Sequence, residues 1–317
     1  MAVTLEQAKL NVQDDLQLGV IDEFRKSTWL FDNLIFDDVV SATGGGATLT
    51  YAYTRLKTQP TAGFRNVNEE YATSEVEKQR FTADLKIFGG GFKVDRVIAN
   101  MGGIADEVAL QMAQKIKAAG ALFNDTVING DSAVDSKSFD GLEKALKGSS
   151  TEYKPAAAID LSTSEAVTKN FQAFLDALDE FLMTLDGKPS FIGGNTKLIA
   201  KLRACARRAG MYQVTKDSFG NQVESYGGIP FVDFGSKPGT NDDVVKTETT
   251  GETSLYAARI GLDGFHGISM AGQPPVKTWL PDFATAGAVK EGEVEMIAAV
   301  ALKATKAAGV MRKIKVK

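Results

Sequence analysis

The sequence has very little cysteine and histidine, the residue types that most often build metal sites and nucleophiles. Its 317 residues contain one cysteine, Cys205, and one histidine, His266. A single cysteine excludes an intrachain disulfide and a cysteine-rich metal site, and a single histidine excludes a metal site made from several histidines. The sequence therefore predicts no bound metal and no cofactor.

A long apolar run and a strong charge are also missing. No run approaches the roughly 20 apolar residues of a membrane span, and the first residues show no basic stretch followed by an apolar one, so neither a membrane anchor nor a secretory signal is expected. The net charge of -4 lacks the basic excess typical of dedicated nucleic-acid binders, although it allows a protein that lies near nucleic acid. With 44% hydrophobic residues the chain is an ordinary globular protein, expected to fold in a reducing cytoplasm.

Both candidate catalytic side chains are better explained as structural. His266 stands in a Gly-Phe-His-Gly segment, and the sequence has no Gly-x-Ser-x-Gly motif that would supply a nucleophile beside it. Cys205 shares the apolar face of a predicted helix with Leu202, where a cysteine normally behaves as a small inert hydrophobe. Carboxylates are plentiful but scattered, so no pair suited to acid–base work stands out. We predict no catalytic residues and no enzyme activity.

Two glycine triplets enclose one stretch of the chain and are interpreted as hinges. The hinge residues are Gly44, Gly45, Gly46, Gly89, Gly90 and Gly91. Glycine adopts backbone angles that are closed to other residues, so a triplet can act as a pivot. Neither triplet is followed by Gly-Lys-Ser/Thr, and neither fits Gly-x-Gly-x-x-Gly between a strand and a helix, so a phosphate-binding loop is disfavoured.

Between the triplets the sequence predicts a β-hairpin with a long polar loop. Residues 47–56 and 81–88 alternate between apolar and polar side chains, as half-buried strands do. Their connection, Lys57–Glu77, is too long for a tight turn. An isolated two-stranded ribbon is marginal in water, so this hairpin needs another surface, which we expect to be a second copy of the same protein. The candidate intersubunit contacts are Arg55, Arg65, Glu69 and Glu70.

The rest of the sequence predicts a mixture of helices and strands. Apolar residues at helical spacing predict helices over 103–129, 163–186 and 196–209, the second with a capping box formed by Ser162 and Glu165. Strands are expected at 191–192, after the glycine pair at 227–228, at 254–270 and at 294–303, and a basic tail is expected over 311–317.

Two further segments leave alternatives open. Residues 1–42 indicate an arm with short helices, and its apolar patch over 29–36 either folds back onto the body or docks on a neighbour. The third helix carries a basic cluster, which is either a solvated face or, less favoured, a contact with packaged nucleic acid. The members of this cluster are Lys201, Arg203, Arg207 and Arg208.

The order of these parts carries a resemblance. The long helix is followed by Asn-Gly-Asp at 129–131 and Phe-Asp-Gly-Leu at 139–142, and later come Asp-Ser-Phe-Gly at 217–220, Gly-Gly-Ile-Pro at 227–230 and a strand over 294–302. In order and spacing the chain resembles the major capsid protein of tailed bacteriophages, with the Hong Kong 97-type fold that encapsulin shells also use. The likeness covers nearly the whole chain.

The resemblance implies an α+β fold with five parts. They are an N-terminal arm (1–42), an extended loop formed by the β-hairpin (43–92), a peripheral domain whose first part holds a long spine helix (93–157), an axial domain (158–270) and the C-terminal part of the peripheral domain (271–317).

The same resemblance implies a structural subunit that self-assembles into pentamers and hexamers of an icosahedral phage head enclosing double-stranded DNA. Such a protein would be found in the virion after assembly in the cytoplasm of a host bacterium. Its expected partners are copies of itself, a portal and a separate scaffold protein, because the arm at 1–42 leaves no room for a built-in scaffold. DNA would be met through weak, non-specific contacts.

Two alternatives to the phage head remain at this point. One is an encapsulin-like nanocompartment shell, and the other is a soluble enzyme with an unrecognised site.

Some members of the capsid family cross-link lysine to asparagine, and Lys57, Lys78 or Lys86 could supply the amine. No asparagine or catalytic carboxylate can be singled out, so ordinary surface lysines are the favoured interpretation.

Overall fold

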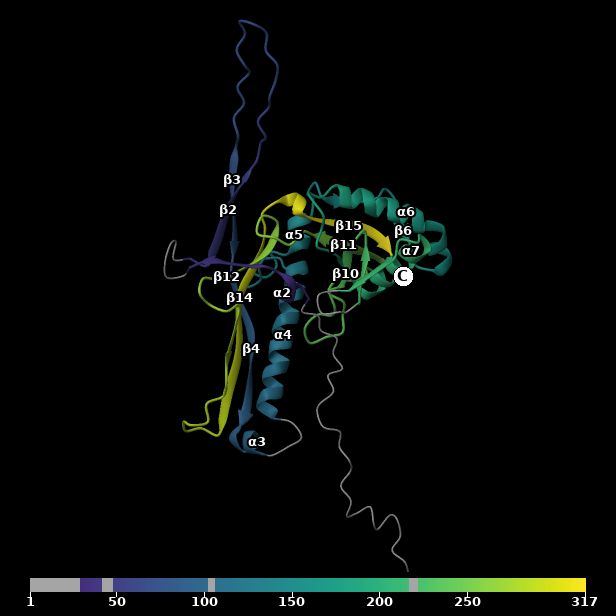
Figure 1. Ribbon diagram of the computed structural model, residues 1–317. Helices are drawn as coiled ribbons and strands as arrows, with labels where there is room; N and C mark the ends of the chain where they lie inside the picture. The colour runs from purple at the N-terminus through teal and green to yellow at the C-terminus, as the bar shows by residue number, and fades with distance from the viewer. Residues whose placement is uncertain (1–28, 42–47, 102–105, 217–221) are drawn as a thin grey trace, which may run out of the picture.

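The computed structural model describes residues 29–41, 48–101, 106–216 and 222–317, arranged as an elongated sheet unit beside a second, rounder lobe (Figure 1). The expected short helices at 1–28, the first glycine triplet and the Asp-Ser-Phe-Gly segment at 217–220 lie outside the described residues. The α+β fold class is confirmed, because the described chain combines helices with sheets whose strand pairs are mostly antiparallel.

The elongated unit is a five-stranded sheet with the order β1-β12-β14-β13, in which β4 also pairs with β14. Its strands are β1 (Phe36–Val40), β4 (Lys86–Asp95), β12 (Phe265–Met270), β13 (Val276–Trp279) and β14 (Val289–Leu302). The β4 and β14 strands run antiparallel from Lys86 opposite Ala298 to Asp95 opposite Val289. This long ladder ends beside the short helix α3 (Arg96–Asn100), at the bottom of the unit in Figure 1.

Helix α4 (Glu107–Asn129) lies along this sheet as the predicted spine (Figure 1). The Asp106 carboxylate caps its first turn, because Oδ1 accepts hydrogen bonds from the backbone nitrogens of Val108 at 2.9 Å and Ala109 at 3.3 Å. The helix stops at Gly130, as the sequence predicts. Its 23 residues make a rod of roughly 35 Å at about 1.5 Å per residue.

The second lobe is built on an eight-stranded sheet with the order β5-β15-β11-β7-β10-β9-β8, to which β6 is joined through β15. Its strands are β5 (Glu152–Tyr153), β6 (Ile159–Asp160), β7 (Phe191–Gly194), β8 (Gln213–Lys216), β9 (Gln222–Tyr226), β10 (Ile229–Asp233), β11 (Glu252–Ala258) and β15 (Ala308–Lys315). The short helix α5 (Leu142–Leu146) and a 3-10 turn (Thr305–Ala307) connect the two units.

Two amphipathic helices, α6 (Ser164–Met183) and α7 (Thr196–Arg208), pack on this lobe (Figure 1). Both are confirmed within a few residues of their predicted ends. The predicted cap of α6 is wrong by one residue: Thr163, not Ser162, accepts a hydrogen bond from the Ala166 nitrogen at 3.1 Å. Thr163 is the residue that still has extended backbone angles, with φ -110° and ψ 165°, which is the geometry an N-cap requires.

The apolar patch before the hairpin packs on its own chain. In α2 (Trp29–Asn33) the Leu30 side chain is completely buried, and its backbone nitrogen donates to the Asn124 side chain at 3.2 Å. The Trp29 ring meets the Phe191 ring edge-on at 5.3 Å. Of the two alternatives for this patch, the structure shows the fold back onto the body.

Two segments pair across the expected domain bounds. The β12 strand falls inside the expected axial segment 158–270, but it pairs with β1 and β14 of the five-stranded sheet. The basic tail over 311–317 is instead mostly part of β15, which pairs with β11 in the other sheet. Its apolar residues explain this, since Val310, Met311 and Ile314 are completely buried. Val310 belongs to one core and Met311 and Ile314 to the other, so both faces of this strand are covered.

Candidate assembly site

The predicted hairpin forms and projects from the body as a sheet of its own (Figure 1). Strand β2 (Thr50–Leu56) pairs with β3 (Lys78–Asp84), with Thr50 opposite Asp84 and Leu56 opposite Lys78. Beyond this ladder the connection has no regular secondary structure, and every residue from 57 to 80 is exposed. Isolated hydrogen bonds keep its two sides close together. In one of them the Lys57 backbone nitrogen donates to the Glu77 carbonyl at 2.8 Å. The ribbon therefore has little support from its own chain.

Three of the predicted intersubunit residues lie at the far end of this ribbon. Arg65 lies over the Tyr71 ring at 5.2 Å, and the Glu69 carboxylate accepts a hydrogen bond from the Asn66 backbone nitrogen at 3.2 Å. These short-range bonds shape a turn at the tip. Glu70 is exposed beside them. Their contact with another subunit stays a prediction.

Large apolar side chains are also exposed at the tip. Phe64 is 109% exposed and Val67 is 87% exposed, while Tyr71 is 62% exposed. Apolar side chains gathered on an extended segment are typical of a docking surface. Sequence reasoning missed this feature because it treated the loop as polar.

Arg55, the fourth predicted contact, is engaged at the base of the hairpin within its own chain. Its Nε donates to the Lys303 carbonyl at 2.7 Å, and its other nitrogens donate to the Leu302 carbonyl and to the Thr305 hydroxyl. The Tyr53 hydroxyl donates to the same Leu302 carbonyl at 3.0 Å. This set, which we call the Arg55 grip, ties the hairpin to the end of β14.

The second glycine triplet lies inside β4 rather than at a turn. Gly89, Gly90 and Gly91 face Glu295, Val294 and Glu293 of β14 in the ladder. The chain passes from β3 to β4 at Leu85, which is buried and whose nitrogen donates to the Leu49 carbonyl at 2.8 Å. A hinge role for either triplet stays a prediction, and the geometry at the second one is that of a strand.

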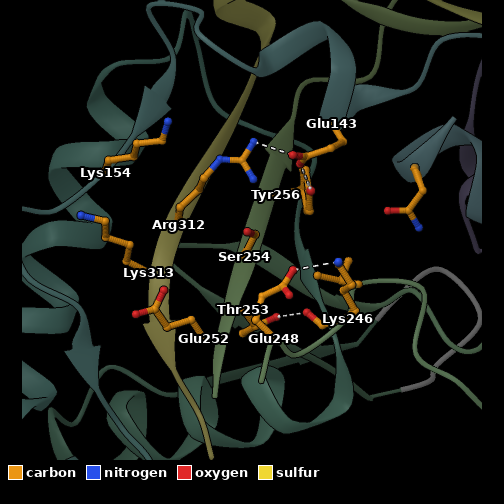
Figure 2. A pocket seen from close by; sticks show the side chains of 12 residues that line it. Glu143, Lys154, Lys246, Glu248, Glu252, Thr253, Ser254, Tyr256, Arg312 and Lys313 are labelled. Carbon is orange, nitrogen blue, oxygen red and sulfur yellow. Dashed lines mark hydrogen bonds and ion pairs between the residues drawn. The ribbon is translucent and has the colours of Figure 1, made fainter. Parts of the chain in front are cut away.

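A polar cavity of about 470 Å³ lies elsewhere, between α5 and strands β11 and β15. Figure 2 shows its central group: the Arg312 guanidinium and the Tyr256 hydroxyl both point toward the Glu143 carboxylate. Arg312 also contacts Glu152 at 2.5 Å. The ring of Tyr256 is buried, and burial raises its phenol pKa, as does Glu143.

The chemistry of this cavity is that of a structural ion network. Its charged side chains pair with one another, as Lys246 does with Glu248 at 2.9 Å. It contains neither the histidine nor the cysteine of the chain. The network joins α5 of one unit to β15 of the other, so it holds the two units together.

The histidine and the cysteine each lie in the interior. Cys205 is completely buried, and burial raises the pKa of its thiol to about 11, so it stays protonated and unreactive. His266 is completely buried beneath the base of the hairpin, where its ring meets the Tyr51 ring edge-on at 5.8 Å. Neither side chain is paired with a nucleophile in the manner of a catalytic triad.

The basic cluster on α7 is partly neutralised within the chain. The Lys201 ammonium donates to the Ser162 carbonyl at 2.7 Å, and the Arg203 guanidinium pairs with Glu224. Arg208 donates to the Ala204 carbonyl at 3.3 Å. These contacts favour the interpretation as an ordinary surface over a nucleic-acid site.

A spine helix along a narrow sheet, a second lobe of sheet and helices, and a projecting ribbon together define the Hong Kong 97-type fold of protein shells. No protein-family model and no curated protein sequence matches the chain. Solved structures do match it over its full length.

Three of these structures illustrate the likeness. The holo-SrpI encapsulin complex of Synechococcus elongatus PCC 7942 is 17% identical, with a TM-score of 0.65 over 100% of this chain and 98% of that one. Mycobacterium phage Bobi is 13% identical, with a TM-score of 0.62 over 98% of each chain. The capsid of Myoviridae phage XM1 is 9% identical, with a TM-score of 0.61 over 99% of each chain. The chain thus has the predicted fold at very low sequence identity.

None of the helices in the described residues combines the length and the hydrophobicity needed to cross a bilayer. The described part of the chain also holds no group of three or more metal-ligating side chains in a suitable arrangement.

Proposed function

We propose that this chain is a structural subunit of a closed icosahedral shell, assembled as pentamers and hexamers of a phage head that encloses double-stranded DNA. The observation that carries the proposal is the exposed ribbon over 57–77 on a fold that matches capsid structures along its whole length. In this proposal the arm, extended loop, peripheral domain and axial domain have the roles implied by the sequence.

The ribbon supports the proposal because it needs a surface that its own subunit does not supply. An isolated two-stranded ribbon is marginal in water, and this one carries Phe64 and Val67 fully out in solvent. In a ring built from head-to-tail contacts, each subunit uses different patches on its two sides. A ribbon laid over the next subunit buries its own apolar tip and enlarges the interface toward the size of obligate contacts. Arg65, Glu69 and Glu70 would flank that contact.

The remaining partners follow from the proposed phage head. A separate scaffold protein and a portal would take part in assembly in the host bacterium, and the shell would become part of the virion. The net charge of -4 supports only weak, non-specific contact with packaged DNA.

A second candidate, an encapsulin-like nanocompartment, is favoured by one observation. The solved encapsulin complex of Synechococcus elongatus matches the chain with a TM-score of 0.65, at least as high as the phage capsids named above. A shell of that kind would hold a cargo enzyme rather than DNA.

The test is the size and the content of the purified particle. We expect size-exclusion chromatography with light scattering to show megadalton particles, and negative-stain microscopy to show closed shells. Nuclease-protected DNA inside them supports the phage head, and a single co-purified enzyme supports the nanocompartment. A small oligomer that turns over a substrate bound near Arg312 and Glu143 would instead establish the enzyme alternative.

A further inference from the structure

The hairpin rests on a polar cluster, partly buried, that is contributed by four separate segments. Asp37 comes from β1, Tyr51 from β2, His266 from β12, and Lys303 directly follows β14. One atom is shared by all of them: Oδ2 of Asp37 accepts the Tyr51 hydroxyl at 2.9 Å, and it lies 3.8 Å from the Lys303 ammonium and 4.0 Å from Nε2 of His266. We call these residues the Asp37 cluster.

His266 is the member of this cluster whose ring nitrogens are least well paired. Its side chain is 0% exposed, and among the described residues neither ring nitrogen makes a hydrogen bond of good geometry, although the Gly264 carbonyl lies near enough to favour the protonated ring. Its neighbour across the ladder, Ala301, offers no side-chain polar group. A buried polar group without a partner is rare in folded proteins and calls for a physical explanation.

The groups around His266 hold the ring uncharged near neutral pH. Burial lowers the pKa of His266, and the Lys303 ammonium acts in the same direction. The Asp37 carboxylate, the Gly264 carbonyl and the more distant Asp263 oppose this shift but do not reverse it. The Tyr51 phenol stays protonated, because burial and Asp37 raise its pKa. A proton added to His266 would therefore place a second cation beside Lys303, with one carboxylate between them.

Lys303 connects this charge balance to the Arg55 grip. Its carbonyl accepts the Arg55 Nε at 2.7 Å, and its backbone nitrogen donates to the Gly264 carbonyl at 2.9 Å. Gly264 lies two residues before His266. The residue whose ammonium would face a charged imidazole is therefore the same residue whose carbonyl Arg55 holds.

We propose that His266 is a proton-operated catch for the hairpin: protonation of its buried ring displaces Lys303, loosens the Arg55 grip and frees the angle of the β2–β3 ribbon. The catch belongs to a single subunit, so its action does not depend on whether that subunit builds a shell. It gives the ribbon two states, one held and one free, whose populations depend on pH.

The test measures the ribbon angle directly as a distance between spin labels. Labels are attached at Thr73→Cys on the ribbon and Ser150→Cys on the body, both exposed, while Cys205 is completely buried and stays unlabelled. We expect a narrow distance distribution at about pH 7.5 and a broad or shifted one at about pH 5.5. Light scattering at both pH values separates a change of angle from a change of assembly state.

Three variants make the result decisive. His266→Gln, which stays neutral, should keep the narrow distribution at both pH values. Arg55→Ala should give the broad distribution at both, because the grip is absent. Lys303→Met, which removes the charge but keeps the carbonyl, should reduce the response to acid, and it serves if His266→Gln does not fold. A wild-type distribution independent of pH, an equal response in His266→Gln, or a narrow distribution in Arg55→Ala would overturn the proposal.

Discussion

At the scale of single residues, the clearest energetic role belongs to Glu152. Burial raises the pKa of its carboxyl, but hydrogen bonds from Lys154, the Gly148 backbone and Arg312 outweigh burial and lower the pKa to about 2. The ionised form is therefore favoured in the folded state. Glu152 and Glu143 both pair with Arg312, and this pairing is the centre of the network in Figure 2.

The low pKa of Glu152 predicts a specific loss of stability in acid. A carboxyl whose pKa is depressed on folding stabilises the protein at pH values above its ordinary pKa of 4.5, and this contribution is lost as the pH falls toward about 2. A carboxyl pKa that is lower by one in the folded than in the unfolded state adds roughly 1.4 kcal/mol to the unfolding free energy. Denaturant unfolding of the wild type should therefore lose more stability between pH 5 and pH 2 than unfolding of Glu152→Gln.

A matched control is available in a second, more exposed ion pair. The Glu248 side chain is 54% exposed where it pairs with Lys246, and exposed pairs contribute little. Glu248→Gln should follow the wild type across the same pH range. Identical pH profiles for the wild type and Glu152→Gln would mean that the network carries no net stability.

At the scale of secondary-structure elements, the second glycine triplet is explained by close approach of two strands. A Cβ added at Gly89 would lie 1.9 Å from the Val294 carbonyl oxygen, whereas one at Gly90 would first meet the end of the Lys115 side chain at 3.5 Å. The β4–β14 ladder thus requires a glycine at one position and tolerates a side chain at the next.

This steric difference predicts a large loss of stability for one substitution and almost none for the adjacent one. Gly89→Ala should destabilise the subunit by about 2 kcal/mol or more, because β4 must shift away from β14 to relieve the overlap. Gly90→Ala should change the unfolding free energy by less than about 0.5 kcal/mol. Thermal and denaturant unfolding of both variants measure these values.

The same pair of variants tests the hinge interpretation. If the triplet acts as a hinge, both alanine variants should impair assembly while their stability stays near that of the wild type. If it acts as a strand, only Gly89→Ala should be impaired, and its loss of stability should account for its loss of assembly.

The elements themselves were largely predictable, because their signals are local. The spine helix has apolar residues at helical spacing and a stop at Gly130, and the structure bears out both. Its described part begins at Glu107, with Asp106 as the N-cap, whereas the sequence predicted a start at 103. The pairing of strands was not predictable in the same way, since it depends on contacts distant in the chain. Nothing local distinguishes β15 as a strand of the second lobe rather than a tail.

The candidate assembly site also combines features that local sequence patterns predict with contacts that they do not predict. Alternation at 47–56 and 81–88 sufficed to predict a hairpin, which the observed β2–β3 register confirms. The bounds of its second strand were wrong, because β3 spans Lys78–Asp84 and residues 86–88 belong to β4, which pairs with β14 in the five-stranded sheet. The Arg55 grip depends on the carbonyls of Leu302 and Lys303, about 250 residues further along. No pattern near Arg55 indicates such partners, so an intersubunit contact was the natural but unsupported interpretation.

At the scale of the whole molecule, the ribbon and the body are energetically separate. The body holds two buried cores, one shared by the five-stranded sheet, α4 and one face of the second lobe's sheet, the other between that sheet and helices α6 and α7, and neither includes residues 57–77. Deleting residues 57–77 should therefore lower the free energy of unfolding of the subunit only slightly. The same deletion removes the segment that we expect to contact other subunits.

A deletion tests this separation. Replacing Lys57–Glu77 by Asn-Gly, which closes a tight turn between the paired residues Leu56 and Lys78, should leave the circular dichroism spectrum and the thermal midpoint close to those of the wild type. Closed particles should be absent from electron micrographs of this variant.

An equal-length Gly/Ser replacement of the same segment is the matched control, because it keeps the reach of the ribbon but removes Phe64, Val67 and Tyr71. It should also fail to close shells if apolar docking at the tip matters. Complete shells from the deleted variant would show that the ribbon is dispensable for closure.

The placement of the two tryptophans has a practical consequence. Trp29 is packed against Phe191, where the segment before the hairpin meets the second lobe, while Trp279, at the end of β13, is 46% exposed. With only two indoles in the chain, replacing either one by phenylalanine leaves a single native fluorophore. Its emission wavelength and quenching then report, without any attached dye, on docking of the leading segment or on covering of the distal sheet edge.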